Sequence, residues 1–328
     1  MQSSGTMDAV RHGEAPLRAV IPPALAGLRL DQALARMFHD YSRTMLKDWI
    51  VAGRLRVDDA PKRPRDTVTG GEVVELWPDP TPVVEDAAQP LALAVRYEDP
   101  ELLVIDKPAG LVVHPGAGNR QGTLLNALLH HDAALAGLAR AGIVHRLDKD
   151  TSGLMVVARS ARAQLRLIEA LRRHEVQRGY RAVVQGAMIA GGRVDAPLGR
   201  HPHERLRMAV HARGKSAVTH YRVVGRFRGH TLIDLALETG RTHQIRVHMA
   251  HIGHPIVGDP VYGGRLKRPA GMSEAAARCL LDFQRQALHA YRLSFRHPLD
   301  GRPLSFEAPL SEDMAQLLEV LGEDARRG

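Results

Sequence analysis

Three polar segments of the sequence combine residue types that could carry out chemistry. They are VIDKPAG at 104–110, HRLDKDTSG at 145–153 and TGRTHQIR at 239–246. Each lies where a strand is expected to end, and polar groups at the ends of rigid elements are a common way to build active sites. The carboxylates of Asp148 and Asp150 could act as a nucleophile or as a base. A guanidinium such as that of Arg241 would favour the ionised form of a carboxylate beside it.

A purely structural interpretation of the same residues is also open. The sequence DKDTSG at 148–153 has the composition of a turn, in which Asp and Ser side chains bond to local amides and Gly accepts positive φ. Thr242 is a plausible N-cap for a short helix. That helix would bury a stripe made of Ile245, His248, Met249 and Ile252. Residue types alone therefore do not separate a plain turn from a catalytic loop.

The elements around these segments predict an α+β fold. Strand-like pieces are expected at 102–106, 154–158, 180–185, 218–224 and 231–237. Helices are expected at 123–131, at 161–173 with Ser160 as N-cap, and at 242–252 ended by Gly253. Because the strands do not alternate regularly with helices, we predict a mixed, largely antiparallel sheet with helices packed on it.

A separate module is predicted near the N-terminus. Leu30, Leu34 and Phe38 recur at four-residue intervals, as in an amphipathic helix. A second short helix would begin at the N-cap Ser42 and end at Gly53, followed by short strands at 55–57 and 73–76.

The basic residues of this module suggest a binding surface. Arg43 and Lys47 share a helix face at a spacing of four. The adjoining strand and loop hold Arg54, Lys62, Arg63 and Arg65. Together these residues could form one phosphate-binding face. The alternative is a charged surface that only contacts water.

Composition divides the chain and limits its class. Residues 1–17 lack apolar periodicity and are predicted to be a flexible tail. The module is placed at 18–77, a proline-rich linker at 78–92, and a second domain at 93–328, because 328 residues exceed the usual size of a single core.

Charge and apolar content predict the compartment and the kind of partner. The single cysteine, Cys279, rules out an internal disulfide. No apolar run is long enough for a signal-peptide core or a membrane span, so a cytoplasmic protein without membrane contact is expected. The net charge of +9 favours a polyanionic partner, although it could serve solubility alone.

Longer stretches of the sequence resemble a known family. HRLDKDTSGL, TGRTHQIRVH and IDKPAGLVVHP are similar to the pseudouridine synthases of the RluA type, and the resemblance runs from residue 93 to about 315. The preceding module, with Arg29-Leu30-Asp31 and Tyr41-Ser42-Arg43 at the starts of its helices, resembles the alpha-L RNA-binding module. Together they resemble the RluD-like branch, which modifies large-subunit ribosomal RNA.

This resemblance implies an activity and a set of site residues. It implies that Asp148 is catalytic while Asp150 is structural, and that Tyr180 and Arg241 complete the site. The isomerisation of uridine to pseudouridine gains and loses no atom, so no cofactor is expected. The implied partner is large-subunit ribosomal RNA or a pre-ribosomal particle. A monomer is expected, but the sequence leaves the oligomeric state open. Arg146 and Lys149 flank Asp148 and could hold phosphates, as could His145, although Arg146 could instead be a structural ion-pair partner.

Two rival functions are weighed against this one. A metal enzyme is suggested by His243, His248, His251 and His254, but no carboxylate or cysteine lies among them, so no metal is expected. A non-catalytic RNA-binding protein would not need the set Asp148, Tyr180 and Arg241. The sequence leaves open which uridines are modified, and whether Asp148 attacks the sugar or removes its 2′ proton to give a glycal.

Overall fold

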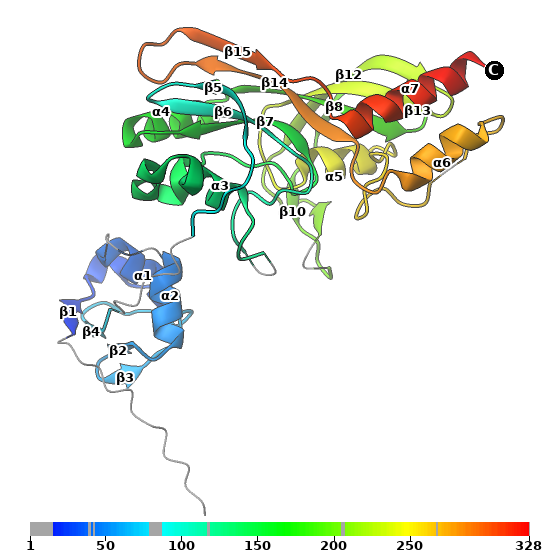
Figure 1. Cartoon of the computed structure of the whole chain (residues 1–328). Helices are drawn as coiled ribbons and strands as arrows, with labels where there is room; N and C mark the ends of the chain where they lie inside the picture. Colours follow the sequence, from blue (N-terminus) through cyan, green and yellow to red (C-terminus); the bar gives the residue numbers. More distant parts are fainter. Residues whose placement is uncertain are drawn as a thin grey trace, which may run out of the picture. The chain divides into compact units, whose positions relative to one another are not determined.

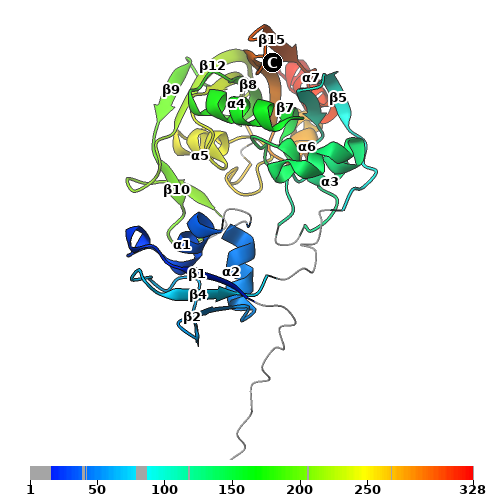
Figure 2. The same cartoon turned by 90° about the vertical axis from the view of Figure 1, so that its left-hand side faces the viewer.

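The computed structural model describes residues 16–38, 41, 43–78, 87–116, 119–204, 207–266 and 268–327. The chain divides into two compact units, Met1–Glu85 and Asp86–Gly328 (Figures 1 and 2). Each unit has its own hydrophobic core. Among the described residues, no helix has the length and apolar character needed to cross a membrane.

The smaller unit packs two helices on a four-stranded antiparallel sheet of order β1-β4-β2-β3. Its elements are β1 (Leu17–Val20), η1 (Pro23–Leu25), α1 (Leu30–Met37), α2 (Arg43–Val51), β2 (Leu55–Val57), β3 (Ala60–Pro61) and β4 (Val73–Leu76). Leu30 and Leu34 are fully buried and face the core, which explains the four-residue spacing of apolar residues.

The expected helices and strands of this unit are found, with small differences at their ends. Gly53 follows α2 with a φ of 74°, the left-handed stop that its position indicates. Strand β1 already begins at Leu17, the last residue assigned to the tail, because Leu17 pairs with Leu76 of β4. Residues 1–15, Ser42 as an N-cap and residues 79–86 of the expected linker lie outside the described residues.

The larger unit is built on a nine-stranded sheet of order β5-β6-β7-β14-β8-β13-β12-β9, with β15 paired to β14 (Figure 1). Its strands are β5 (Ala94–Glu98), β6 (Leu102–Lys107), β7 (Ser152–Ala158), β8 (Gln177–Gln185), β9 (Gly192–Asp195), β12 (Val218–Phe227), β13 (His230–Leu237), β14 (Leu288–Arg296) and β15 (Pro303–Glu307). Among the strand pairs formed by the described residues, β7–β14 alone is parallel. The expected mixed, largely antiparallel sheet is confirmed.

Helices cover both faces of this sheet. They are α3 (Leu124–His131), α4 (Ala161–Arg172), α5 (Gln244–His251), α6 (Glu274–Asp282) and α7 (Glu312–Arg326), with η2 (Ala133–Gly137) and η3 (Ala139–Gly142). Successive residues of β6 point to opposite faces of the sheet and enter different cores. Leu102 packs with α4, whereas Leu103 belongs to the main core with α3, α5, α6 and α7. A separate hairpin pairs β10 (Leu198–Arg200) with β11 (Met208–Val210).

The start of α5 corrects one expectation. The helix begins at Gln244 rather than Thr242, and the residue before it is His243, in a left-handed conformation with φ 56° and ψ 19°. Thr242 is therefore not the N-cap. By contrast, the expected cap of α4 is present, since the hydroxyl of Ser160 accepts the N–H of Ala163 at 3.1 Å.

The turn before β7 depends on one glycine. Gly153 has a φ of 115°, and a Cβ atom built on it would lie 2.3 Å from the carbonyl oxygen of Ala290 in β14. Only glycine allows this conformation and this close approach of the two parallel strands. The last residue of the DKDTSG segment thus fixes where the turn joins the sheet.

We therefore predict that Gly153→Ala destabilises the larger unit. Both the strained φ and the collision with Ala290 oppose the substitution, so its melting temperature should fall by at least about 3 °C. Calorimetry of the full chain measures this. Gly137→Ala, where no atom lies within 4 Å of the added Cβ, is the matched control and should change the melting temperature little.

Candidate active site

Asp148 lies on a tight turn that rigid neighbours hold in place. The amide of Thr151 donates to the carbonyl oxygen of Asp148 at 3.1 Å, which closes the expected turn. The ammonium of Lys107, 1% exposed at the end of β6, donates to the carbonyl oxygen of Lys149 at 2.8 Å. Gln286 donates to the Thr151 hydroxyl at 3.0 Å. The turn is therefore fixed from several sides, and the Asp148 side chain retains 18% exposure.

Lys107 is an unusual support because its amino group is buried. Burial lowers the pKa of Lys107 to about 7, and the negative charges of Asp150 and Asp148 oppose that shift. Its Nζ also donates to the carbonyl oxygens of Pro108 and Leu111, at 2.8 and 2.9 Å. The IDKPAG segment thus supports the turn that carries Asp148.

The charge partner of Asp148 is Arg246, in the first turn of α5. Its Nη1 donates to Oδ2 of Asp148 at 3.0 Å. The same guanidinium donates through Nε and Nη2 to both oxygens of Asp259, at 2.7 and 2.8 Å. The Arg246 side chain is 6% exposed, so this arginine bridges two carboxylates inside the protein.

The electrostatics of this bridge favour the charged forms of its buried members. Burial raises the pKa of Asp259, but hydrogen bonds from Arg246 and from the amides of Tyr262 and Val261 outweigh it and hold that pKa below its usual value. Burial also lowers the pKa of Arg246, yet Asp259 and Asp148 together raise it further. Arg246 therefore stays a cation beside Asp148.

Arg241 does not occupy the place expected for it. Its Nε donates to the carbonyl oxygen of Ser216 at 3.2 Å, and its amide donates to Oε1 of Gln244 at 3.0 Å. The expectation that Arg241 stands beside Asp148 as its charge partner is wrong, because the chain enters α5 so that Arg246 faces inward. Arg241 still lines the same cavity as Asp148.

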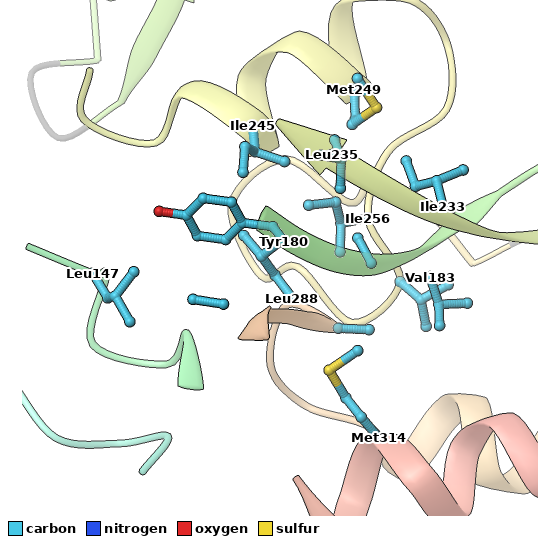
Figure 3. Close-up of a cluster of buried hydrophobic side chains, with 14 of the residues drawn as sticks. Leu147, Tyr180, Val183, Ile233, Leu235, Ile245, Met249, Ile256, Leu288 and Met314 are labelled. Atoms are coloured by element: carbon cyan, nitrogen blue, oxygen red, sulfur yellow. The ribbon is translucent and has the colours of Figure 1, made fainter. Parts of the chain in front are cut away.

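Tyr180 joins this cavity from the core side. It belongs to β8, is 5% exposed, and packs with Leu147, Ile245 and Leu288 in the main core. Figure 3 shows its ring beside Ile245, with the hydroxyl pointing away from Leu235 and Ile256. Burial raises the pKa of Tyr180, Asp148 adds to the rise and Arg178 opposes it. The tyrosine is therefore held as a neutral phenol at neutral pH.

The cavity has a volume of about 1090 Å³ and is rich in cations. Besides Asp148, Tyr180 and Arg246, it is lined by Arg140, Arg146, Arg172, Arg178 and Arg241. Arg146 is exposed and forms no ion pair with any residue that the structure describes, so the structural ion-pair interpretation finds no support there. Arg178 contributes a buried Nε that meets no acceptor in the described part of the chain. Cations without carboxylate partners leave this wall suited to an anionic ligand.

Two residues that flank Asp148 differ from the arginines. Lys149 is exposed but is not among the residues that line the cavity. His145 accepts the amide of Val156 through Nε2 at 3.1 Å, and burial, with Arg178 adding to the effect, lowers the pKa of His145 to about 3. A neutral imidazole that is bonded to the backbone cannot hold phosphate as a cation, so His145 does not have the phosphate-binding role expected for it.

The basic residues of the smaller unit gather around Asp31. Its carboxylate, 3% exposed, accepts from Arg43 at 2.7 and 3.0 Å and from Arg29 at 3.0 Å. Burial raises the pKa of Asp31, but these two arginines outweigh it and lower that pKa. The surrounding hollow, of about 640 Å³, is also lined by Lys47, Arg63 and Arg65. Arg43 and Lys47 are thus brought together, whereas Arg54 does not line this hollow.

Two of the histidines that suggested a metal have other partners. His248 shares hydrogen bonds with the Thr219 hydroxyl and the Ala196 carbonyl oxygen, both at 2.9 Å. His254 is bonded to the Gln185 carbonyl oxygen at 2.9 Å. No group of three or more His, Cys, Asp or Glu in the described ranges is arranged to hold a metal ion.

Comparisons with known proteins agree with this fold. Residues 101–251 match the model of the RNA pseudouridylate synthase family, and residues 28–74 match that of the S4 domain. A protein named ribosomal large subunit pseudouridine synthase D from Xanthomonas campestris is 54% identical over 94% of each chain. A protein of the same name from Escherichia coli K12 is 53% identical, over 94% of this chain and 95% of its own.

A solved structure gives the same result for the larger unit. Human RNA Pseudouridylate Synthase Domain Containing 4 matches with a TM-score of 0.55 and 27% identity, over 70% of this chain and 93% of that one. The fold and its sequence relatives define a class, the pseudouridine synthases, which are isomerases. The chain belongs to the RNA pseudouridylate synthase family and carries an S4 domain at its N-terminal side.

Sequence reasoning missed Arg246 and Asp259. A signal for Arg246 was present, since TGRTHQIR holds two arginines five residues apart, but only the direction of α5 decides which one faces Asp148. Asp259 follows Gly258 in a loop beyond α5, and nothing in its local sequence indicates a partner thirteen residues away.

We predict that the two arginines of TGRTHQIR differ sharply in their effect on turnover. Arg246→Lys keeps a cation but cannot bridge both carboxylates, so it should cost about 2 kcal/mol of transition-state stabilisation, or roughly thirtyfold in kcat. The matched substitution Arg241→Lys should change kcat by less than about threefold, because Arg241 does not touch Asp148. Equal losses in the two variants, measured as pseudouridine formation, would refute the assignment of Arg246 as the partner of Asp148.

Proposed function

We propose that this protein isomerises uridines to pseudouridine in large-subunit ribosomal RNA, with Asp148 as the carboxylate that acts on the sugar. The observation that carries the proposal is the Asp148 carboxylate, fixed by Arg246 at 3.0 Å in a cavity lined also by Tyr180. The names of relatives more than 50% identical over nearly the whole chain support the choice of RNA.

The reaction explains why a carboxylate is needed. The bond from the base nitrogen to the sugar breaks, the uracil turns, and its carbon-5 joins the same sugar carbon. The proton leaves carbon-5 and one returns to the nitrogen, so atoms and electrons balance without a cofactor. A carboxylate can attack the anomeric carbon, or remove the neighbouring 2′ proton to give a glycal.

The neighbours of Asp148 suit both of these routes. Arg246 binds Oδ2 of the carboxylate at 3.0 Å and leaves a lone pair of Oδ1 available for the reaction. The buried ring of Tyr180 offers a flat apolar surface on which a released uracil can stack. Because the base must leave its stack to reach Asp148, the arginines of the cavity would offset part of that cost by contacts with phosphates.

The smaller unit supplies a second phosphate-binding surface in this proposal. Asp31 orients Arg29 and Arg43 at the hollow that Lys47 also lines. Guanidinium groups held in one direction lose little freedom when they meet a phosphate. We assign this surface to RNA binding rather than to chemistry.

Asp148→Asn tests the catalytic assignment. The amide keeps the size of the carboxylate but cannot act as nucleophile or base, so turnover should fall by about three orders of magnitude or more while RNA affinity is kept. A residual rate within about tenfold of wild type would contradict the proposal. Asp150→Asn is the control on the same turn, and it should retain turnover. Retained RNA binding without turnover also separates an enzyme from a non-catalytic RNA-binding protein.

Removal of residues 1–85 tests the role of the smaller unit. The division of the chain at 85 predicts that the larger unit keeps its fold. Phosphate contacts set the slope of log affinity against log salt, so the truncated enzyme should bind RNA more weakly with a flatter slope. On short RNA substrates, KM should rise while kcat stays within about twofold. If the slope of log RNA affinity against log salt is the same without residues 1–85, the RNA-binding role proposed for Arg43 and Lys47 is contradicted.

A further inference from the structure

His243 is held in a costly backbone conformation next to the candidate carboxylate. Its φ of 56° is left-handed, a region that non-glycine residues rarely adopt and that clusters at functional sites. Although it occupies the N-cap position of α5, its side chain makes no capping hydrogen bond. The helix therefore does not explain why a histidine is placed there.

Tyr262 holds one nitrogen of this imidazole. The Tyr262 hydroxyl, on a residue 8% exposed, accepts the amide of Met208 at 2.9 Å and lies 2.8 Å from Nδ1 of His243. While its oxygen accepts from Met208, the phenol still has a proton that it can donate to Nδ1. A neutral imidazole that accepts at Nδ1 carries its proton on Nε2.

The other ring nitrogen, Nε2, faces Asp148. Nε2 of His243 lies 3.9 Å from Oδ1 of Asp148, while Oδ2 is bonded to Arg246 at 3.0 Å. The other tautomer would turn a lone pair towards the carboxylate, which is unfavourable. The Arg246 guanidinium also lies 5.1 Å from the centre of the Tyr262 ring, so one tyrosine contacts both groups that surround the carboxylate.

We propose that His243 is a positioning residue, which with Tyr262 directs an Nε2–H towards Oδ1 of Asp148 and so fixes the rotation of that carboxylate. The inference rests on the proposed function, in which Asp148 performs the chemistry. A separation of 3.9 Å is longer than a hydrogen bond, and such contacts often shorten only when substrate fills the site. Burial lowers the pKa of His243, against the opposing effect of Asp148, in keeping with a neutral donor.

Imidazole nitrogen shifts in the full-length protein test the tautomer directly. NMR with nitrogen-15 histidine should show His243 protonated on Nε2 in the wild type. Tyr262→Phe, which removes only the hydroxyl, should shift the population towards Nδ1–H. A wild-type His243 that carries its proton on Nδ1 would overturn the proposal.

Kinetics of two variants test the consequence. Tyr262→Phe should lower kcat about tenfold and leave KM within about twofold, because it removes the hydrogen bond that orients His243, together with the bond to the Met208 amide, and no RNA contact. His243→Asn should have an effect at least as large, since Asn tolerates the left-handed backbone but is too short to reach Oδ1. Tyr291→Phe, whose hydroxyl contacts Asp234 at 3.4 Å away from the cavity, is the matched control and should match wild type.

The double variant separates positioning from general stability. The double variant combines Tyr262→Phe with His243→Asn. If Tyr262 acts through His243, the kcat of the double variant should equal that of His243→Asn alone, and all three variants should melt close to the wild-type temperature. Additive losses in kcat would reject the proposal. Asp148→Asn separates a failure of the proposed function from a failure of the positioning role. If Asp148→Asn stays active, the proposed function fails. If it is inactive while Tyr262→Phe and His243→Asn both equal wild type in kcat, only the positioning inference fails.

Discussion

The candidate active site depends on one guanidinium shared between two carboxylates. A buried arginine is stable only when its donors are used and its charge is balanced. Asp259 takes two nitrogens of Arg246, and the third donates to Asp148. The carboxylate that faces the cavity is thus held by a cation that cannot move without leaving Asp259 buried and unpaired.

This bridge explains the arrangement of the surrounding elements. Arg246 comes from α5, Asp259 from the loop after it, Asp148 from the turn before β7 and Tyr180 from β8. Strand β7, which follows the turn of Asp148, and strand β8, which carries Tyr180, are connected through β14, because β14 pairs with both. Gly153 lets β7 approach β14 closely, and Lys107 supports the turn from β6. The sheet register is therefore part of the geometry of the site.

Charge is distributed unevenly between the groups near Asp148. Among the described residues, the cavity is lined by several arginines and by only two acidic residues, Asp148 and Glu238, while two of its histidines are kept neutral. Burial lowers the pKa of His114 to about 4, with Arg140 and Arg146 adding to the shift, and that of His145 to about 3. The cavity thus combines fixed positive charge for an anionic strand with neutral hydrogen-bonding groups, an arrangement suited to a nucleotide.

The sequence by itself determined the α+β class, the helices α1 to α4 and most strands of the site. These elements follow local rules: apolar spacing of four in α1, a serine cap on α4, and glycine at the stop of α2. It also indicated, through family resemblance, the turn that carries Asp148. Such features depend on neighbours in the chain, so they are visible without coordinates.

Only the tertiary structure decided which arginine meets Asp148. Arg241 and Arg246 lie in one motif, and the left-handed residue His243 between them turns the chain so that the second arginine points inward. Asp259 and Tyr262 became part of the site for the same reason, because contacts across many residues depend on how α5 packs against the sheet. Local sequence carries no information on such distant contacts, since they are fixed by packing and by the need to pair every buried charge.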